Sequence, residues 1–440
     1  MFSGHRMQPK HLIKGRGKAM NMSTDAATID ERPLSEIDVS DAQLYREDSW
    51  EPLFRRLRRD APVHFHESSA NGPYWSVSSH EHIKAVDTQH EVFSSADGIS
   101  IAETPPEDEL KDTDVVIENF IAMDPPGHDQ QRATVAPSVA PSNLANFQPL
   151  IRERVEDILD NLPVGETFDW VDAVSVELTA RMLATLFDFP YADRRKLIHW
   201  SDITTSTPEL TGEELVDQQQ RKDDLMECAQ VFMQLWHERA AAAPKFDLIS
   251  MLAHGKDTKD MIQQPMLFLG NILLLIVGGN DTTRNSISGG VQALNQFPDE
   301  YRKLEANPGV IPNMVSEMIR WQTPVIHMRR RALQDVELDG KTIRAGDKVV
   351  MWYLSGNRDE SMYHEPEKLI VDRWNARTHV AFGYGVHRCM GNRLAEMQLR
   401  VLWEEIQKRF RKIEVVGEVE RNANNFIRGI NTLPVQLHPR

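Results

Sequence analysis

The chain has 440 residues, of which 40% are hydrophobic, so it can bury a large core. Acidic residues outnumber basic ones by 66 to 50, a formal net charge of −16, which argues against non-specific nucleic-acid binding and indicates a soluble protein. Two cysteines, Cys228 and Cys389, are too few for a disulfide framework or a cysteine-only zinc site. We therefore expect a protein of the reducing cytoplasm.

No run of residues reaches the roughly 18 to 20 apolar positions needed to cross a bilayer. The longest candidate, Met266–Gly279, is interrupted by Gly270 and Asn271 and is typical of a buried core helix. We predict no transmembrane segment. Residues 1–40 are polar and begin with a basic stretch, which predicts a poorly ordered tail before a single domain over residues 41–440.

Helix and strand signals alternate along the first hundred residues. Helices are expected over Ser49–Asp60 and Ser79–Thr88, and strands over Val63–His66 and Tyr74–Val77. Residues 95–120 have no clear period and predict a long loop, a kind of segment that is often functional.

Helical periodicity dominates the rest of the chain. Helices are expected over Leu150–Leu162, Trp170–Phe187, Gly212–Arg239, Asp260–Phe297, Asn313–Trp321 and Gly391–Phe410. Thr204–Gly212 reads as a flexible break, and Ser355–Gly385 as an irregular segment. Strands are expected over Val336–Leu338, Thr342–Arg344 and Lys348–Trp352. The predicted fold class is mainly α with a small β part.

The most specific feature is a glycine-rich segment around the second cysteine, Phe382-Gly383-Tyr384-Gly385-Val386-His387-Arg388-Cys389-Met390-Gly391. Glycines let the backbone turn its N–H groups towards the sulfur, and the following helix adds positive potential at its N-terminus. Both effects favour a thiolate, the form that ligates metals. The alternative is a free cysteine in a tight turn. Cys228, within an amphipathic helix, is expected to be a core residue.

This segment resembles the haem-binding signature of the cytochrome P450 superfamily, Phe-Gly-x-Gly-x-His-x-Cys-x-Gly, at every defined position. The resemblance implies a triangular-prism helical core around a buried haem b (iron protoporphyrin IX). It implies that Cys389 is the axial ligand of the iron, and that Phe382, His387 and Gly391 belong to the cofactor site. Thiolate ligation favours O–O cleavage.

A second motif, Gly278-Gly279-Asn280-Asp281-Thr282-Thr283, interrupts the long apolar helix. Two mid-helix glycines cost about 1 kcal/mol each relative to alanine, and the polar neighbours add a desolvation cost. A helix kink is the alternative explanation. In the P450 resemblance, Gly278 leaves room for the flat cofactor or O2. Asp281 and Thr282 match the acid–alcohol pair that supplies protons for oxygen activation.

Glu317 and Arg320 are spaced to share one helix face. Such a pair is usually a surface ion pair worth little. It also matches the Glu-x-x-Arg element of the P450 family, in which a later arginine, here Arg373, completes a structural triad. The resemblance implies that this triad holds the cysteine loop against the core helices.

Haem carries two propionates, which need cationic or donor groups at the rim of the cleft. The family pattern assigns this role to His128, Arg132, Arg330 and His387. For each residue taken alone, ordinary surface charge is the alternative.

The residues expected to form the substrate pocket are apolar. They are Leu274, Val277 and Gly278 on the long helix, and Val325 and Ile326 in the segment leading to Arg330. Such residue types predict a narrow apolar pocket, with plain core packing as the alternative.

Three longer blocks resemble the bacterial alkane and medium-chain fatty-acid terminal (omega) hydroxylases: Leu275–Asn285, Ile319–Pro324 and Phe382–Glu396. This resemblance implies hydroxylation of a terminal carbon with O2. The alternatives are a haem-thiolate hydroxylase of another apolar substrate, such as a terpenoid or steroid, a peroxide-driven enzyme and a non-enzymatic haem binder.

Electrons must come from another protein, because the sequence carries no flavin or iron–sulfur motif. The resemblance implies a 2Fe-2S ferredoxin with an NAD(P)H-dependent reductase. Arg388, Arg393 and Arg400 lie on or just beyond the cysteine loop and are candidates for a basic docking patch. A solvated helix face is the alternative.

Overall fold

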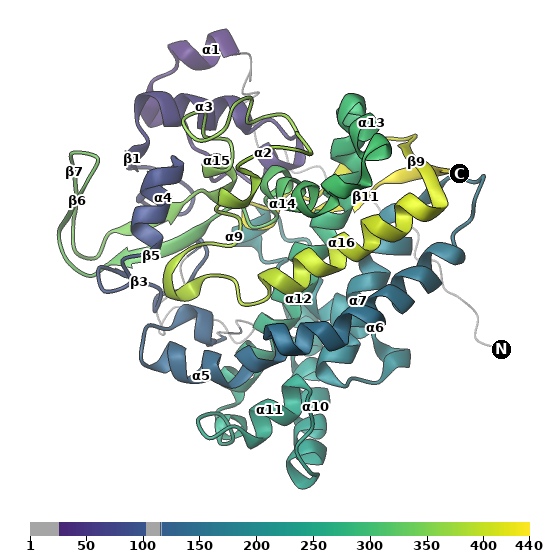
Figure 1. Cartoon of the computed structure of the whole chain (residues 1–440). Coiled ribbons are helices and arrows are strands. Elements are labelled where there is room, and N and C mark those ends of the chain that lie inside the picture. The colour runs from purple at the N-terminus through teal and green to yellow at the C-terminus, as the bar shows by residue number, and fades with distance from the viewer. Residues whose placement is uncertain (1–25, 103–114, 116) are drawn as a thin grey trace.

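The computed structural model describes residues 26–102, 115 and 117–440 (Figure 1). Residues 1–25, most of the tail predicted from the sequence, lie outside the described residues. Residues 26–40 differ from that prediction. Ile29, Ile37 and Val39 are buried in a cluster with Trp352 and Tyr74, because these apolar side chains find partners across the first sheet.

The helices follow the amphipathic segments of the sequence. They are α1 (Ala26–Glu31), α2 (Gln43–Arg46), α3 (Glu51–Asp60), α4 (His80–Asp87), α5 (Gly127–Val135), α6 (Pro141–Asp160), α7 (Glu177–Phe187), α8 (Arg195–Thr204), α9 (Pro208–Thr211), α10 (Gln218–Ala241), α11 (Leu248–His254), α12 (Pro265–Gln296), α13 (Pro298–Ala306), α14 (Ile311–Gln322), α15 (Tyr353–Gly356) and α16 (Asn392–Arg409).

The strands are short. They are β1 (Val63–His66), β2 (Tyr74–Val77), β3 (Phe93–Ser94), β4 (Phe168–Asp169), β5 (Met328–Ala332), β6 (Val336–Leu338), β7 (Lys341–Ile343), β8 (Lys348–Met351), β9 (Phe410–Val415), β10 (Glu420–Arg421), β11 (Ile430–Thr432) and β12 (Pro434–Pro439). The largest sheet has the order β1-β2-β8-β5-β3. In it β2 runs parallel to β8, and β5 runs antiparallel to β8 with Arg330 opposite Val349.

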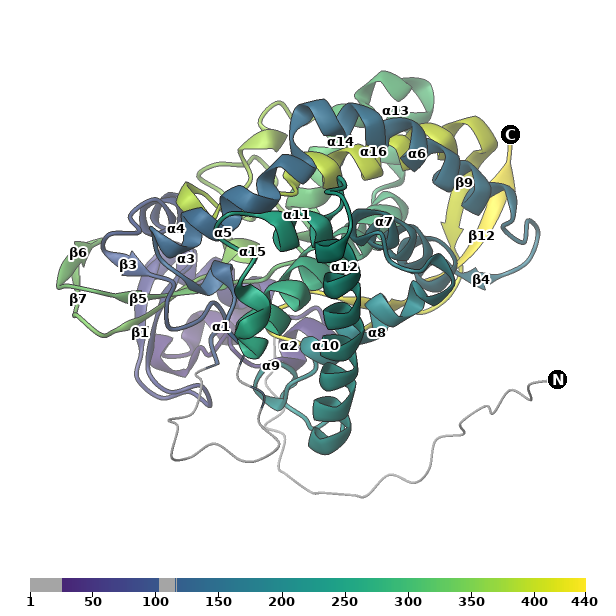
Figure 2. The same cartoon turned by 90° about the horizontal axis from the view of Figure 1, so that it is seen from below.

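The sheet and the main helices occupy different parts of the molecule. Figure 1 shows the five-stranded sheet with α3 and α4 on one side, while α6, α7, α14 and α16 fill the other. Helix α12 packs against α7, α8 and α10, which are labelled near it in Figure 2, turned by 90° from Figure 1. The small β part and the many helices agree with the predicted class.

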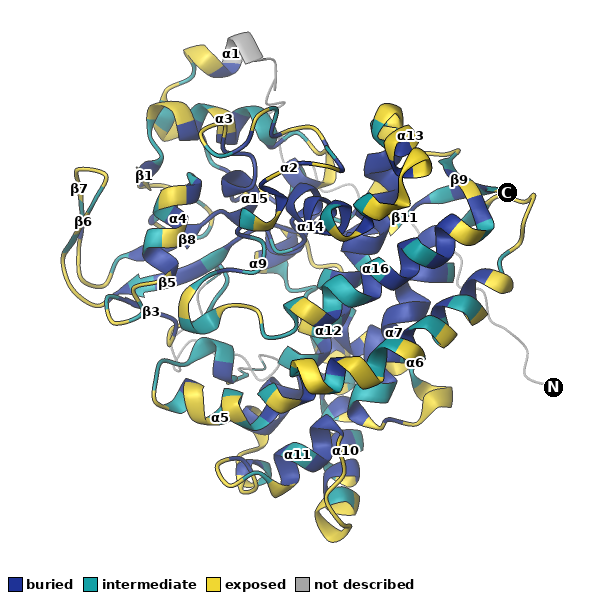
Figure 3. Ribbon diagram, viewed as in Figure 1, coloured by how far each residue is buried: buried dark blue, intermediate teal, exposed yellow. Residues whose placement is uncertain are grey.

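Helix α12 is the centre of the core. It packs against α7, α8 and α14, and Figure 3 shows much of it in the colour of buried residues. Within the described part of the chain, it is the one helix long and apolar enough to cross a membrane. However, 61% of its most apolar stretch is buried inside the protein, as expected for a core helix.

Some boundaries differ from the sequence prediction. Strand β5 was not predicted, because its sequence Met-Arg-Arg-Arg-Ala lacks an apolar alternation, yet it pairs with both β3 and β8. The predicted break at Thr204–Gly212 contains the short α9. The predicted helix over Trp170–Phe187 begins with a π-type turn over Val171–Val176 before α7.

Candidate active site

A cavity lies between α12 and the cysteine loop, which we define as residues 382–391. Apolar side chains from α7, α11, α12 and α16 line part of it. The sequence-predicted residues that line it are Arg132, Leu274, Gly278, Thr282, Val325, Arg330, Phe382, His387, Cys389 and Gly391. Residues more than 250 positions apart in the sequence therefore line one cavity.

The cysteine loop is shaped by glycine. Gly383 and Gly385 both have positive φ, 63° and 65°. A Cβ atom on Gly385 would lie 2.3 Å from the carbonyl oxygen of Asp87, so no other residue fits there. The Cys389 N–H donates to the Phe382 carbonyl at 2.8 Å and closes the loop. The sulfur is thereby held at the cavity.

Cys389 has exposed surface, and it is one of the residues that line the cavity. Burial raises the pKa of the Cys389 thiol, although the backbone N–H groups of Gly391 and Asn392 and the charge of Arg132 oppose this rise. The expected N–H groups are thus present, but they do not outweigh burial. Metal binding releases the proton of such a thiol, so the loop is suited to a thiolate bound to a cation.

On α12, three residues one turn apart face the cavity: Leu274, Gly278 and Thr282. A Cβ atom on Gly278 would meet no atom within 4 Å, whereas one on Gly279 would lie 2.8 Å from Leu183. Gly278 therefore keeps the cavity wide, and Gly279 allows close helix packing. The Thr282 hydroxyl donates to the Gly278 carbonyl at 2.9 Å.

Asp281 does not line the cavity. Its side chain is fully buried on the α8 side of α12, where Ser201 donates to Oδ2 at 3.2 Å and the Arg284 guanidinium lies 2.9 Å from Oδ1. Arg284 also contacts Asp202 at 2.6 Å. Burial raises the pKa of Asp281 to about 6, with Arg284 opposing the rise. The predicted acid–alcohol pair is thus divided between two sides of one helix, with only Thr282 in the cavity.

Two residues predicted for the substrate pocket lie elsewhere. Val277 is one turn before Asp281 and shares its side of α12, away from the cavity. Ile326 is fully buried in the cluster with Trp352. It points away from the cavity because successive side chains of an extended segment alternate, and its neighbour Val325 faces inward.

Beside the cysteine loop, the rings of His128 and His387 lie 4.3 Å apart. Both ring nitrogens of His387 and Nε2 of His128 are buried without a hydrogen-bond partner in the described structure. Burial lowers the pKa of His387 to about 2, reinforced by Arg330, so its ring is neutral. His128 lies behind His387 and does not itself line the cavity. Arg132 does, and it donates to the Arg388 carbonyl at 2.5 Å.

Arg330 reaches the cavity from β5. Its Nη2 contacts Oδ1 of Asp87, the last residue of α4, at 2.9 Å. Sequence reasoning missed Asp87, because nothing local in α4 indicates a contact with a residue 243 positions later.

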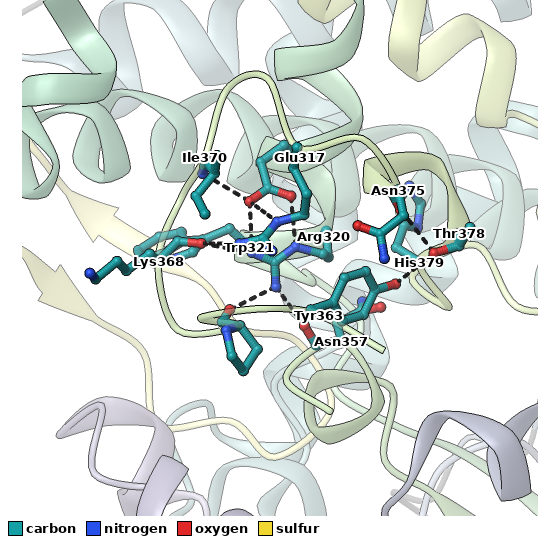
Figure 4. A network of polar contacts seen from close by, with 12 residues as sticks. Glu317, Arg320, Trp321, Asn357, Tyr363, Lys368, Ile370, Asn375, Thr378 and His379 are labelled. Atoms are coloured by element: carbon teal, nitrogen blue, oxygen red, sulfur yellow. Dashed lines mark hydrogen bonds and ion pairs between the residues drawn. The ribbon is translucent and has the colours of Figure 1, made fainter. Parts of the chain in front are cut away.

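Two members of the predicted structural triad, Glu317 and Arg320, meet in the core (Figure 4), and Arg373 joins them through Glu317. Glu317 accepts from Arg320 Nε at 2.7 Å and from Arg373 Nε at 2.9 Å, and all three side chains are buried. Arg320 also donates to the carbonyls of Asn357 and Lys368. The triad therefore ties α14 to the irregular segment that leads to the cysteine loop.

Comparison with known proteins decides the family. A model of the cytochrome P450 family matches residues 164–436. The chain belongs to the cytochrome P450 family. It is 36% identical to linalool 8-monooxygenase of Pseudomonas putida, across 93% of this chain and all of that protein. It is 29% identical to a methyl-branched lipid omega-hydroxylase of Mycobacterium bovis, across 94% and 99% of the two chains. The structure of CYP153D17 from Sphingomonas sp. PAMC 26605 superposes with a TM-score of 0.85 at 49% identity, covering 92% of this chain and all of that one.

This P450 is a haem-dependent monooxygenase, and its fold is that of the family. The P450 fold implies the use of O2, an apolar substrate and a redox partner.

The residues of the cavity fit haem b. A buried polar atom left without a partner costs about 1–3 kcal/mol, so the unpaired nitrogens of His387 and His128 indicate a ligand with acceptor oxygens, as propionates have. Arg132 and Arg330 add positive charge to the same wall, and Gly278 leaves open space on the opposite one. Cys389 lines the same cavity and would provide a sulfur for the iron.

Proposed function

We propose that this P450 hydroxylates the terminal carbon of n-alkanes or medium-chain fatty acids in the cytoplasm. The observation that carries the proposal is the apolar wall above the cysteine loop, formed by Leu274, Val325 and Met328 beside Gly278. Among the described residues that line the cavity, the charged ones are Arg132 and Arg330, for which we propose roles at the propionates. A chain therefore enters with its apolar end first, and a carboxylate stays outside.

The sequence blocks that resemble terminal hydroxylases support this substrate class, and so does the relative named as a lipid omega-hydroxylase. Terminal C–H bonds are stronger than internal ones, so selectivity for the chain end must come from orientation. In this proposal the apolar wall provides that orientation, because it places the end of a linear chain next to the reacting centre.

Bound haem b supplies O2 activation and the insertion of one oxygen atom into a C–H bond. The overall reaction is R–CH3 + O2 + NAD(P)H + H+ → R–CH2OH + H2O + NAD(P)+. We assign to Cys389 the ligation of the iron, and to His387, Arg132 and Arg330 the binding of the propionates. Phe382 and Gly391 pack beside them in the cavity wall.

In this proposal Thr282 presents a proton at Oγ1 on the cavity side of α12. Asp281 replenishes it, and its pKa of about 6 suits proton exchange near neutrality. Because Asp281 is held by Arg284 and Ser201, its carboxyl must leave these partners and rotate before it reaches Thr282. Asp202, whose side chain is 47% exposed, connects the Arg284 end of this network to solvent.

For electron supply we propose a 2Fe-2S ferredoxin with an NAD(P)H-dependent reductase. Arg388, in the cysteine loop, and Arg393, just beyond it, are exposed. Arg377, Arg393 and Arg400 line a hollow of about 370 Å³ between α6, α14 and α16. Glu396 lies in the same hollow and offsets part of this positive charge. An acidic partner surface is the complement of this patch.

The deciding experiment combines the purified enzyme with a 2Fe-2S ferredoxin and its reductase and analyses the products from linear alkanes and fatty acids. Primary alcohols and omega-hydroxy acids are expected. Oxidation only at internal carbons would contradict the proposal. Turnover with peroxide that matches ferredoxin-driven turnover would favour the peroxide-driven alternative.

The relative named linalool 8-monooxygenase supports a second candidate substrate, an acyclic terpenoid. Titration of the haem spin state separates the candidates. A response to alkanes or fatty acids at lower concentration than to linalool supports the terminal hydroxylase, and the reverse order supports the terpenoid.

A further inference from the structure

Asp87 connects three elements around the cavity. It is only 3% exposed at the end of α4, and both of its carboxylate oxygens are engaged. Oδ1 accepts from Arg330 on β5 at 2.9 Å. Oδ2 accepts from the Tyr353 hydroxyl at 2.8 Å and from the backbone N–H of Tyr384 at 2.7 Å. All three partners are donors, as an ionised carboxylate requires.

The first consequence concerns Arg330. Its Nη1 donates to the Arg329 carbonyl at 2.7 Å, and its Nη2 is held by Asp87. An arginine side chain has many rotamers, so two fixed contacts orient the guanidinium before any ligand arrives. The carboxylate also offsets the positive charge that Arg330 brings to the cavity wall.

The second consequence concerns the cysteine loop. A Cβ atom on Gly383 would lie 3.1 Å from both Oδ2 of Asp87 and the Tyr353 hydroxyl. The Tyr384 N–H bond anchors the same turn to Asp87. This turn begins six residues before Cys389, and the Cys389 N–H bond to Phe382 closes the loop at its other end. Asp87 therefore helps to hold the segment that determines the position of the Cys389 sulfur.

We propose that Asp87 is a positioning residue for the haem, which orients the propionate-binding side chain of Arg330 and the cysteine loop through one buried carboxylate. Its negative charge also lowers the reduction potential of the iron, because it favours the more oxidised, more positive form. This role does not depend on the identity of the substrate or of the redox partner. A purely structural role predicts only a loss of stability.

The test is Asp87→Asn in the full chain, purified with haem and measured without substrate or partner protein. The variant keeps the shape of the side chain and removes its charge. Expected results are a lower haem content, a carbon-monoxide difference spectrum shifted in part away from the thiolate-type band, and a more positive midpoint potential. Asp87→Glu, which restores the charge, should return the potential towards that of the wild type.

Asp48→Asn is the matched control. Asp48 is also a carboxylate paired with a buried arginine, Arg428 at 2.8 Å, but Arg428 does not line the cavity, whereas Arg330 does. This variant should lose stability without a change in spectrum or potential. If Asp87→Asn behaves like this control, the proposal is overturned. A folded Asp87→Glu variant with the potential of Asp87→Asn overturns it as well.

A double-mutant cycle tests the route through Arg330. Combined with Arg330→Gln, the Asp87→Asn change should shift the potential less than it does alone, because part of its effect passes through the orientation of that arginine. Equal shifts in both backgrounds would remove Arg330 from the proposal.

Discussion

Asp281 and Thr282 are neighbours in sequence, yet they face different sides of α12. Thr282 opens on the cavity, whereas Asp281 is buried against α8 between Ser201 and Arg284. Neighbouring residues of a helix differ by about 100° in direction, so one turn of α12 serves both the reaction space and the ion-pair network behind it. Substitutions of the two residues should therefore have different effects: at Thr282 on product formation, and at Asp281 on the pH dependence of stability.

Thr282→Ala should reduce product formation without destabilising the enzyme. Among the described residues, the hydroxyl bonds only to the Gly278 carbonyl within its own helix, so the loss in stability should stay within about 0.5 kcal/mol. Loss of a positioned proton donor typically costs about 100-fold or more in the affected step. Product, peroxide and NAD(P)H consumption should be measured together. In Thr282→Ala, NAD(P)H consumption should persist, but hydrogen peroxide should form in place of the hydroxylated product. Thr282→Ser should restore formation of the hydroxylated product. Unchanged coupling in Thr282→Ala would remove its hydroxyl from proton delivery.

Asp281 should make stability depend on pH. Its pKa rises from 3.8 to about 6 on folding, so folded protein binds the proton more tightly than unfolded protein. The contribution of protonated Asp281 to the free energy of unfolding is complete below about pH 4 and is lost as the pH rises through about 6. At roughly 1.4 kcal/mol per pKa unit, the loss is about 3 kcal/mol at most.

Asp281→Asn cannot ionise, so wild type should lose stability relative to this variant between about pH 4 and about pH 6. Thermal unfolding of both proteins across this range measures the difference. Asp202→Asn serves as the control, since Asp202 is half-exposed in the same network. A difference between wild type and Asp281→Asn that does not vary with pH would show that Asp281 does not titrate in this range.

The glycine-rich turn of the cysteine loop could be predicted from the sequence because consecutive residues determine it. Gly383, Gly385 and Cys389 are defined by local backbone demands, and such demands leave a contiguous motif. The period of α12 likewise places Leu274 and Thr282 on one face. The sequence did not predict which face meets the cavity, and Val277, predicted for the substrate pocket, is not among the described residues that line it.

Contacts between distant segments left no local signal. Asp87 ends an ordinary amphipathic helix, and its importance follows only from the approach of Arg330 and Tyr384 in the folded protein. His128, placed in the cofactor site from a family pattern, does not itself line the cavity, but its ring lies 4.3 Å from that of His387 and its Nε2 is buried without a partner among the described residues.

Glu317→Gln should be strongly destabilising. It leaves Arg320 and Arg373 buried with an uncompensated charge, and breaking a buried ion pair typically costs about 3–5 kcal/mol. Denaturant unfolding monitored by both circular dichroism and haem absorbance measures the loss. Asp299→Asn is the matched control, because Asp299 and Arg302 form an acid–arginine pair of the same spacing that is exposed to solvent. That variant should change stability by less than about 1 kcal/mol. Equal losses in both variants would contradict a special role of the buried triad.

Arg393→Glu should slow reduction by an acidic ferredoxin. Arg393 is exposed beside the cysteine loop and shares its hollow with Arg377 and Arg400, so reversal of its charge weakens electrostatic steering of the partner. We expect about a tenfold lower association rate at low ionic strength. The difference should shrink as added salt shortens the screening length. Stopped-flow reduction of the haem at several salt concentrations measures the difference in rate.

Arg302→Glu, a charge reversal at an exposed arginine on α13, is the control. Its haem should be reduced by the ferredoxin as fast as that of wild type. A rate for Arg393→Glu that equals wild type at every salt concentration would place the partner on another face of the enzyme.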